Sequence, residues 1–374
     1  MEQRVDEREW IQFQWPYLMA WLGGEELVNA LAYRSGAFSR RRGIQSPAQM
    51  LQLLLTWAVA ERSLRETAAL ASEAEMAEVS NVALMKRFAR AGEWIGALLG
   101  EVMKVYAVEP RVAVRVRLLD ASSIQRRGSR GTDARLHMRL DLATNRFDAI
   151  ELTDAKGGET VERFTFTAGE IVIADRGYAR RADLAAVVRQ GANFIIRLPW
   201  SNVPLEQPDG TPFDLLGALR ELPEAEAGEF AVAFRSPNGE RIGCRLVAIR
   251  KSEPAAAAER RRLAREKSKR GTSADARTFE AAGYVFVLTN VPSTLSAQTV
   301  LDLYRLRWQI EMKFKTLKSV LHLGNIPVRS TELLQVYVLA KLLVAVLIDQ
   351  FIETAESFSP WGYPLPASEL VATD

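Results

Sequence analysis

The stretch Tyr304–His322 reads YRLRWQIEMKFKTLKSVLH, and the remainder of the chain is organised around it. Drawn as an α-helix, this stretch brings four polar residues within an arc of roughly 60°. They are Tyr304, Arg307, Glu311 and Lys318, and Lys315 lies just beside them. Because Leu303, Leu306, Ile310, Leu317 and Leu321 gather on another stripe, we expect one helix face for a core and one for a partner.

A single carboxylate among several cations and a phenol suits a phosphate ligand. Cations bind an anionic backbone, while the carboxylate can hold a divalent metal beside it. The same stretch also fits an ordinary solvated helix face, since Glu311 and Lys315 form an i,i+4 pair of the common kind. The rest of the chain must therefore decide between a functional and a structural interpretation.

Composition places the chain among soluble globular proteins. It has 374 residues, enough for two or three domains, with 48% hydrophobic and 25% charged residues. Because Cys244 is the single cysteine, a disulfide framework or a cysteine zinc site is excluded, and a reducing cytoplasm fits. His137 and His322 are the two histidines, so a histidine zinc site or a histidine general base is also disfavoured.

The charge and hydropathy patterns predict no membrane partner. No apolar run reaches ~18 residues, and the longest, around 336–348, is broken by Lys341. Residues 1–10 are acidic and polar, unlike a signal peptide. The net charge is +3, yet residues 250–270 hold nine Lys or Arg against three Glu, a local excess of 9 − 3 = 6. That block fits either a solvated helix or a nucleic-acid-binding arm.

Residues 1–108 are expected to form a helical N-terminal DNA-binding domain. Ser46 before Pro47, Ser63 with Glu66 three residues later, and Ser80 are helix-start signals. The helix after Ser80 carries Asn81, Lys86, Arg87 and Arg90, which suggests a helix-turn-helix. A plain helical bundle is the alternative, because the segment between the two helices is longer than the usual turn.

Beyond residue 108 the sequence predicts a mixed α/β core. The expected order is β-β-β-α-β-α-β, with Asp120 ending the first strand, a tight hairpin connection at 143–146, and Asp175 ending the fourth strand. The segments are 109–199 for the first part of the core, 200–283 for a β-rich insertion with the basic block, and 284–356 for the second part with a long C-terminal helix. Residues 357–374 read as a loose tail.

Three carboxylates stand out in this arrangement: Asp120 and Asp175 at strand ends, and Glu311 on the later helix. Strand-end carboxylates are often mere turn formers, and Asp141, Asp148, Asp154 and Asp183 are decoys of the same kind. Brought together, three carboxylates suit two hard cations such as Mg²⁺, which support an in-line phosphoryl displacement. Because clustered carboxylates repel one another, the pKa of at least one should be raised without metal.

The motifs Leu119-Asp120-Ala-Ser, Ala174-Asp175-Arg-Gly-Tyr178 and Tyr304-x2-Arg307-x3-Glu311-x6-Lys318 together resemble the DDE transposases of bacterial insertion sequences. The spacing of the last motif is similar to the branch founded on insertion sequence four, as is Thr289-Asn290-Val-Pro292. The resemblance covers roughly residues 110–350. It implies an RNase H-like catalytic core interrupted by a β-rich insertion, beside the all-α N-terminal domain.

The resemblance also implies roles for individual residues. Asp120, Asp175 and Glu311 would be catalytic and would hold two Mg²⁺ ions, for which Mn²⁺ can substitute. Tyr304, Arg307, Lys315 and Lys318 would contact DNA. The implied reaction is cut-and-paste transposition, in which water attacks at the element's end and the freed 3′ hydroxyl attacks target DNA after a hairpin stage. Relatives stack a flipped base on a tryptophan before the glutamate helix, whereas this chain has Tyr284 and Phe286 there.

Two alternatives to a transposase remain at this point: an RNase H-like DNA nuclease without joining activity, and a non-catalytic DNA-binding relic. Expected partners are double-stranded DNA, as transposon ends and target, and a second copy of the chain, because two ends must be paired. The apolar helix 333–352 could form that homodimer or could complete the core. The expected location is the bacterial cytoplasm, at the nucleoid.

Overall fold

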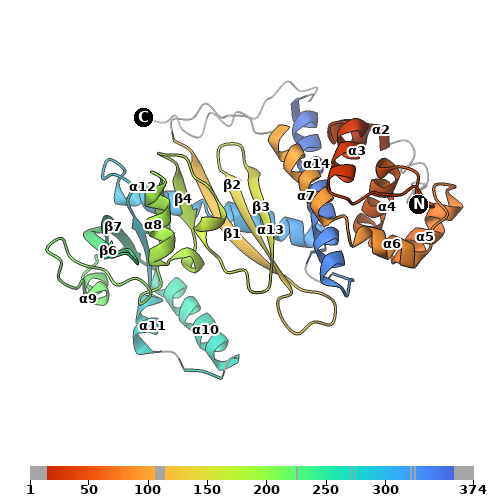
Figure 1. Cartoon of the computed structure of the whole chain (residues 1–374). Coiled ribbons are helices and arrows are strands. Elements are labelled where there is room, and N and C mark those ends of the chain that lie inside the picture. The colour runs from red at the N-terminus through yellow and green to blue at the C-terminus, as the bar shows by residue number, and fades with distance from the viewer. Residues whose placement is uncertain are drawn as a thin grey trace. The chain divides into compact units, whose positions relative to one another are not determined.

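The computed structural model describes residues 15–357, apart from 106–113, 225, 270, 274, 321, 324 and 325. The chain divides into two compact units. The helical unit comprises Met1–Glu109, Ser123–Ala134 and Lys315–Asp374, and the sheet unit comprises Pro110–Ser122 and Arg135–Phe314. Figure 1 labels most of the helices and strands of the two units.

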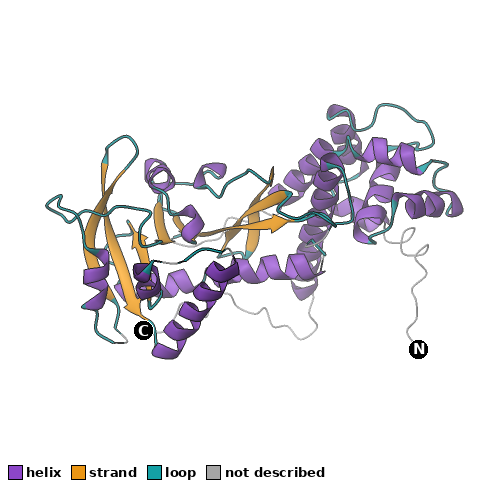
Figure 2. Cartoon of the chain, turned by 90° about the horizontal axis from the view of Figure 1, so that it is seen from below, coloured by secondary structure: helices purple, strands orange, loops and turns teal. Residues whose placement is uncertain are grey.

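The N-terminal part of the helical unit contains helices and, within residues 15–105, no strand (Figure 2). The helices are α2 (Trp15–Trp21), α3 (Glu25–Arg34), α4 (Pro47–Val59), α5 (Leu64–Glu73), α6 (Asn81–Phe88) and α7 (Gly92–Val105). The predicted start signals are confirmed: the Ser46 and Ser80 hydroxyls cap α4 and α6, and Ser63 forms a capping box with Glu66. These caps satisfy backbone N–H groups that a helix start leaves without partners.

The long C-terminal helix α14 (Thr331–Ser357) packs against α7 and α4 in the helical unit. By length and composition its span Thr331–Gln350 could cross a membrane, but 61% of that span is buried inside the protein. Lys341 is also buried and pairs with Glu61 at 2.6 Å. This helix therefore completes the core of its unit, which was one of the two roles expected for it.

The sheet unit is built on one eight-stranded sheet with the order β3-β2-β1-β4-β5-β8-β7-β6. The strands are β1 (Val116–Ile124), β2 (Ala134–Asp141), β3 (Arg146–Asp154), β4 (Ile171–Ala174), β5 (Asn193–Arg197), β6 (Gly228–Arg235), β7 (Arg241–Arg250) and β8 (Tyr284–Thr289). Strands β1, β4 and β5 are parallel neighbours, whereas β8, β7 and β6 continue the sheet in antiparallel fashion. The helices of this unit are α8 (Arg181–Arg189), α9 (Leu215–Arg220), α10 (Glu253–Lys269), α11 (Ala276–Ala281), α12 (Ala297–Arg305) and α13 (Trp308–Val320), which continues into the helical unit.

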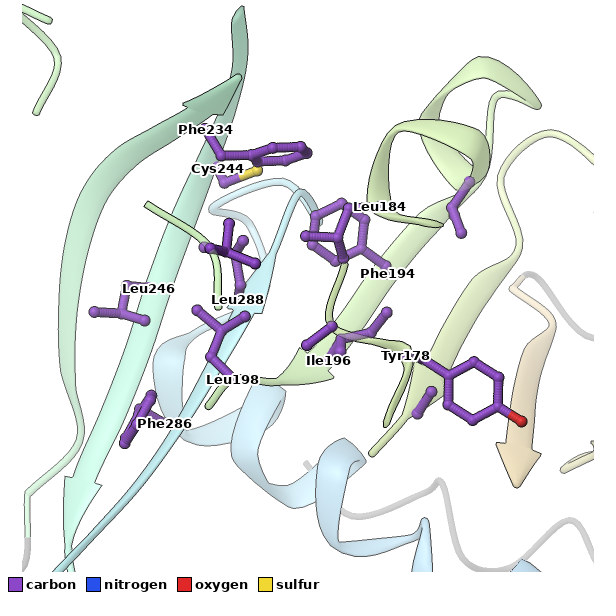
Figure 3. Close-up of a cluster of buried hydrophobic side chains, with 14 of the residues drawn as sticks. Tyr178, Leu184, Phe194, Ile196, Leu198, Phe234, Cys244, Leu246, Phe286 and Leu288 are labelled. Atoms are coloured by element: carbon purple, nitrogen blue, oxygen red, sulfur yellow. The ribbon is translucent and has the colours of Figure 1, made fainter. Parts of the chain in front are cut away.

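The core of the sheet unit runs without interruption from the central strands to the added ones (Figure 3). Phe194 and Ile196 of β5 lie in the same buried cluster as Leu246 of β7 and Leu288 of β8. The strands within residues 200–283 therefore extend the central sheet and share its core. Burial of this cluster supplies the rigid scaffold on which Asp120 and Asp175 are held.

One strand expectation needs correction. Strand β1 runs on to Ile124, so Asp120 lies within the strand and not at its end. The helical element expected between the third and fourth strands is present as a short 3₁₀ helix, Val161–Arg163. The hairpin is confirmed, since β2 and β3 are neighbours joined by four residues, with Asn145 in the left-handed conformation (φ 53°) that a tight turn needs.

Some sequence-based expectations fall outside the described residues. These are residues 1–14 of the N-terminal segment, the start of the first strand at 112–113, Arg270 of the basic block, Leu321, and the tail beyond Ser357.

Candidate active site

Asp120 and Asp175 come together because two parallel strands are in register. Val116, Arg117 and Leu118 of β1 are opposite Ile171, Val172 and Ile173 of β4. Two further steps along both strands set Asp120 beside Asp175, with neighbouring strands ~4.8 Å apart. Strand β4 is buried along its whole length, as expected for an interior parallel strand, and Asp175 is the first half-buried residue after it.

Glu311 reaches the site from a helix that the structure breaks. The single helix expected over Tyr304–His322 is instead α12, a turn at Leu306 and Arg307, and α13. Tyr304 and Ile310 are both buried, yet residues six apart point about 120° away from each other on an unbroken helix. The turn, held by a bond from Arg307 N–H to the Tyr304 carbonyl at 3.1 Å, re-aims α13 so that both side chains reach a core.

A chain of hydrogen bonds links these elements. The Tyr304 hydroxyl donates to Asp175 Oδ1 at 3.3 Å, and Arg307 Nε donates to the Tyr304 oxygen at 3.2 Å. Arg307 Nη1 then pairs with Glu311 Oε1 at 2.5 Å. Asp120 accepts from the N–H of Ala121 at 2.8 Å. The phenol and the guanidinium therefore tie Asp175 on the sheet to Glu311 on α13.

The electrostatics of the site favour the binding of a cation. Burial raises the pKa of Asp120 to about 7, and the nearby Glu311 and Asp175 carboxylates add to this rise. The raised pKa that the sequence predicts is thus present, although burial contributes more than carboxylate repulsion. Burial by itself would lower the pKa of Arg307, but Tyr304, Asp175 and Glu311 more than offset this, so the pKa is raised and Arg307 stays charged.

The donor set fits a hard divalent cation, because Asp120, Asp175 and Glu311 offer carboxylate oxygens alone. Within the described residues, however, no three His, Cys, Asp or Glu side chains are gathered closely enough to hold a metal together. Glu311 is half exposed and its carboxylate is turned to Arg307. Glu311 would therefore have to exchange Arg307 for a metal to complete the site.

The four expected DNA contacts lie in different settings. Tyr304 is 7% exposed and faces Asp175, whereas Arg307 lies in the turn between the helices. Lys315 is exposed on α13, and Lys318 is half-buried in the last turn of the same helix. Both lysines belong to the part of α13 that lies in the helical unit. Which of these four residues touches DNA stays a prediction.

The aromatic residues differ from the sequence-based expectation. Tyr284 and Phe286 both lie in the buried cluster of the sheet unit, so neither presents an open face to a base. Trp308, which the sequence analysis did not single out, is 56% exposed at the start of α13, three residues before Glu311. The signal available in the sequence was a tryptophan three residues before Glu311 that lies off the stripe of leucine and isoleucine residues. Arg176 and Arg197, electrostatic neighbours beside Asp175, were missed as well.

Comparison with known proteins agrees with this arrangement. Residues 115–347 match the family described as the transposase DDE domain, a range that includes all three carboxylates. The transposase of insertion sequence element IS421 from Escherichia coli is 37% identical over 355 residues, covering 92% of this chain and 96% of that protein. The InsL protein of element IS186A from Escherichia coli (strain K12) is also 37% identical, over 354 residues with the same coverage.

A more distant relative is the transposase of element IS231B from Bacillus thuringiensis subsp. berliner. It is 25% identical over 263 residues, which cover 61% of this chain and 54% of that protein.

Proposed function

Because this chain belongs to the DDE transposase family, whose members cleave and transfer DNA with divalent metal, we propose that Asp120, Asp175 and Glu311 are its catalytic carboxylates. The predicted fold class is confirmed by the same match: the catalytic domain is mixed α/β and RNase H-like, with helices at the N-terminus. The observation that carries the proposal is the parallel register that sets Asp120 beside Asp175. The Tyr304 bond to Asp175 supports Glu311 as the third member.

The three carboxylates would hold Mg²⁺, with two ions proposed and Mn²⁺ as a substitute. Such ions activate the attacking oxygen and stabilise the leaving oxygen when they are bound. The protein's own contribution is to orient the carboxylates: β1 and β4 fix two of them, and Tyr304 restrains Asp175 through its hydroxyl. Asp120 would lose its proton on loading, because a ligand carboxylate must be ionised.

Arg307, Lys315 and Lys318 are proposed to bind DNA phosphates, as arginine and lysine side chains commonly do. Tyr304 is proposed to act mainly as a positioning residue, and its own contact with DNA would require movement away from Asp175. The exposed indole of Trp308 is suited to stack on an unpaired base near the cleaved end. This takes the place of the stacking role expected for Tyr284 or Phe286.

We propose cut-and-paste transposition as the overall reaction. Water attacks the phosphodiester at the element's end and releases a 3′ hydroxyl, which later attacks a phosphodiester of target DNA. The substrates are therefore double-stranded transposon ends and target duplex. Two ends must be held together, which supports a homodimer in the end-paired complex, and the bacterial cytoplasm at the nucleoid is the proposed location.

The test is cleavage and strand transfer on a labelled duplex that carries the element's own end, with Mg²⁺. We expect wild type to nick and join DNA and Glu311→Ala to lose both activities by at least about 1,000-fold, while DNA binding persists. Glu229→Ala is the matched control, because Glu229 is likewise an exposed, arginine-paired carboxylate of the sheet unit. It should retain wild-type cleavage.

The outcomes separate the candidate functions. Nicking without joined product in wild type would identify a nuclease, and specific binding without cleavage would identify a non-catalytic DNA-binding protein. Normal activity of Glu311→Ala would show that the metal site has been placed wrongly.

A further inference from the structure

A second group of charges lies beside Asp175. Its cations, named here the cation cluster, are Arg176, Arg197, Lys251 and Arg262. They come from the turn after β4, the end of β5, the residue after β7, and helix α10. Each of the four has Glu259 of α10 among its electrostatic neighbours.

The sheet explains why these cations converge. Ala174 of β4 is opposite Ile196 of β5, so the next residues, Asp175 and Arg197, lie side by side. Lys251 follows directly after β7, and its ammonium donates to the Ala282 carbonyl at 2.8 Å, which leaves two donors for other groups. The cluster thus shares β4 with Asp175, and β5, which carries Arg197, is the neighbouring strand of the sheet.

Glu259 lies among these cations as an internal anion. Arg262 donates to both of its oxygens, at 2.7 and 3.0 Å. Arg262, followed by Lys251 and Arg197, lowers the pKa of Glu259. Burial, and after it the neighbouring Arg197, lowers the pKa of Lys251 to about 8. Asp175 also lies near Arg176 and Arg262, and Glu266 lies near Arg262, so the four cations still outnumber the three carboxylates around them.

The positive surface continues outward along α10. From Arg260 to Lys269 the helix carries six cations and one carboxylate, and most of these side chains are exposed. A surface hollow on this helix is lined by Ala258, Arg261, Arg262, Arg265, Glu266 and Lys269. A helix that is merely exposed to solvent does not need such an excess of positive charge. The phosphates of a DNA strand that runs toward the proposed catalytic carboxylates would neutralise it.

We propose that the cation cluster and the exposed face of α10 bind the phosphate backbone of DNA beside the active site, and that a backbone phosphate takes the place of the Glu259 carboxylate. This proposal rests on the proposed function, because the ligand is the DNA that the enzyme cleaves. It adds a second phosphate-binding surface to Arg307, Lys315 and Lys318. It also makes Glu259 a competitor of DNA for the same cations.

The decisive test is Glu259→Gln, because a competing anion and a structural anion predict opposite results. Binding to the labelled end duplex would be measured in EDTA, so that no cleavage contributes to the readout. We expect Glu259→Gln to tighten binding about 3- to 10-fold at low salt. The matched control is Glu280→Gln: Glu280 also pairs with an arginine, Arg220, but its other charged neighbour is Asp214. It should bind as wild type does.

Lys251→Met tests the cations themselves. It should weaken binding and reduce the slope of log affinity against log salt by about 0.9, the value of one lost phosphate contact. Thermal unfolding of each variant would show whether the fold is kept. Should Lys251→Met fail to fold, Arg262→Gln on the exposed side of α10 gives the same measurement. Unchanged or weaker binding by a folded Glu259→Gln variant would overturn the proposal.

The binding and cleavage results can be told apart. If the charge variants behave as expected but Glu311→Ala still cleaves, the proposed catalytic site fails and the DNA-binding surface stands. If Glu311→Ala is inactive and Glu259→Gln binds no better than wild type, the surface fails and the catalytic site stands.

Discussion

Strand β1 contributes to two clusters of charge whose construction is opposite. The Arg117 cluster joins three arginines to three carboxylates: Arg115, Arg117, Arg139, Asp141, Asp148 and Glu170. Three residues further along β1, the carboxylate triad of Asp120, Asp175 and Glu311 has one salt bridge, Arg307 to Glu311. In the described structure, Asp120 and Asp175 accept hydrogen bonds but form no ion pair.

Each cluster contains three carboxylates, so the number of carboxylates does not distinguish a candidate metal site. What differs is the number of cationic side chains that neutralise them. In the Arg117 cluster three arginines neutralise three carboxylates, so no negative charge is left over to attract a metal ion. The other decoys differ: Asp154 accepts from two N–H groups of its own turn, whereas Asp183 accepts from Thr160 and the Val161 N–H through Oδ1 while its buried Oδ2 has no hydrogen-bond partner among the described residues. What distinguishes the triad is that three carboxylates which influence one another share a single salt bridge, so an outside cation would find several carboxylate oxygens there.

The largest expected effect comes from breaking the Arg117 cluster. Arg117→Met would leave three carboxylates without their shared partner, two of them buried, and should lower the free energy of unfolding by about 3–5 kcal/mol. Urea denaturation measures this. Arg220→Met is the control, because Arg220 is largely exposed in its pair with Glu280 and its loss should destabilise the protein far less. Equal losses in the two variants would mean that the cluster does not stabilise the fold.

A smaller effect of opposite sign is expected in the carboxylate triad. In the folded protein the pKa of Asp120 is raised to about 7, above its unfolded value of 3.8. The folded state therefore holds the proton more tightly, and the stability this provides is lost as pH rises through about 7. At pH 8 without metal, Asp120→Asn should thus stabilise the protein by roughly 1–3 kcal/mol, although cleavage is abolished.

Unfolding of both proteins in EDTA would be followed by urea titration between pH 5 and pH 8. Wild type should lose stability across this range relative to Asp120→Asn, and the two curves should approach each other at the acid end. A variant that is less stable than wild type at pH 8 would mean that Asp120 is held by compensating bonds, like the acids around Arg117.

Much of the fold was readable from sequence because the relevant signals are local. Ser46, Ser63 and Ser80 mark helix starts through hydrogen bonds within four residues, and the hairpin depends on a four-residue connection. The end of β1 and the break after α12 were misjudged, because both depend on tertiary packing. No local pattern shows that Tyr304 and Ile310 must be buried at the same time.

The site was readable only in part, and for a related reason. The spacing of Tyr304, Arg307 and Glu311 is a specific motif, whereas Asp120 looks like Asp141 until each is given its partners. The cations around Glu259 come from four separate elements, so their convergence follows from sheet register and cannot be read from any one stretch.

The smallest effect is expected at Tyr178, which tests whether a further residue acts together with the carboxylate triad. Its hydroxyl is buried, has Asp120 as an electrostatic neighbour, and has no hydrogen-bond partner among the described residues. Because removing an unpaired buried hydroxyl sacrifices no bond, Tyr178→Phe should change the free energy of unfolding by less than about 1 kcal/mol and leave cleavage intact. If cleavage instead falls more than tenfold with unchanged stability and weaker Mg²⁺ binding, the phenol positions Asp120 once metal is bound. Tyr178 would then act together with the carboxylate triad and would not be merely part of the hydrophobic core around it.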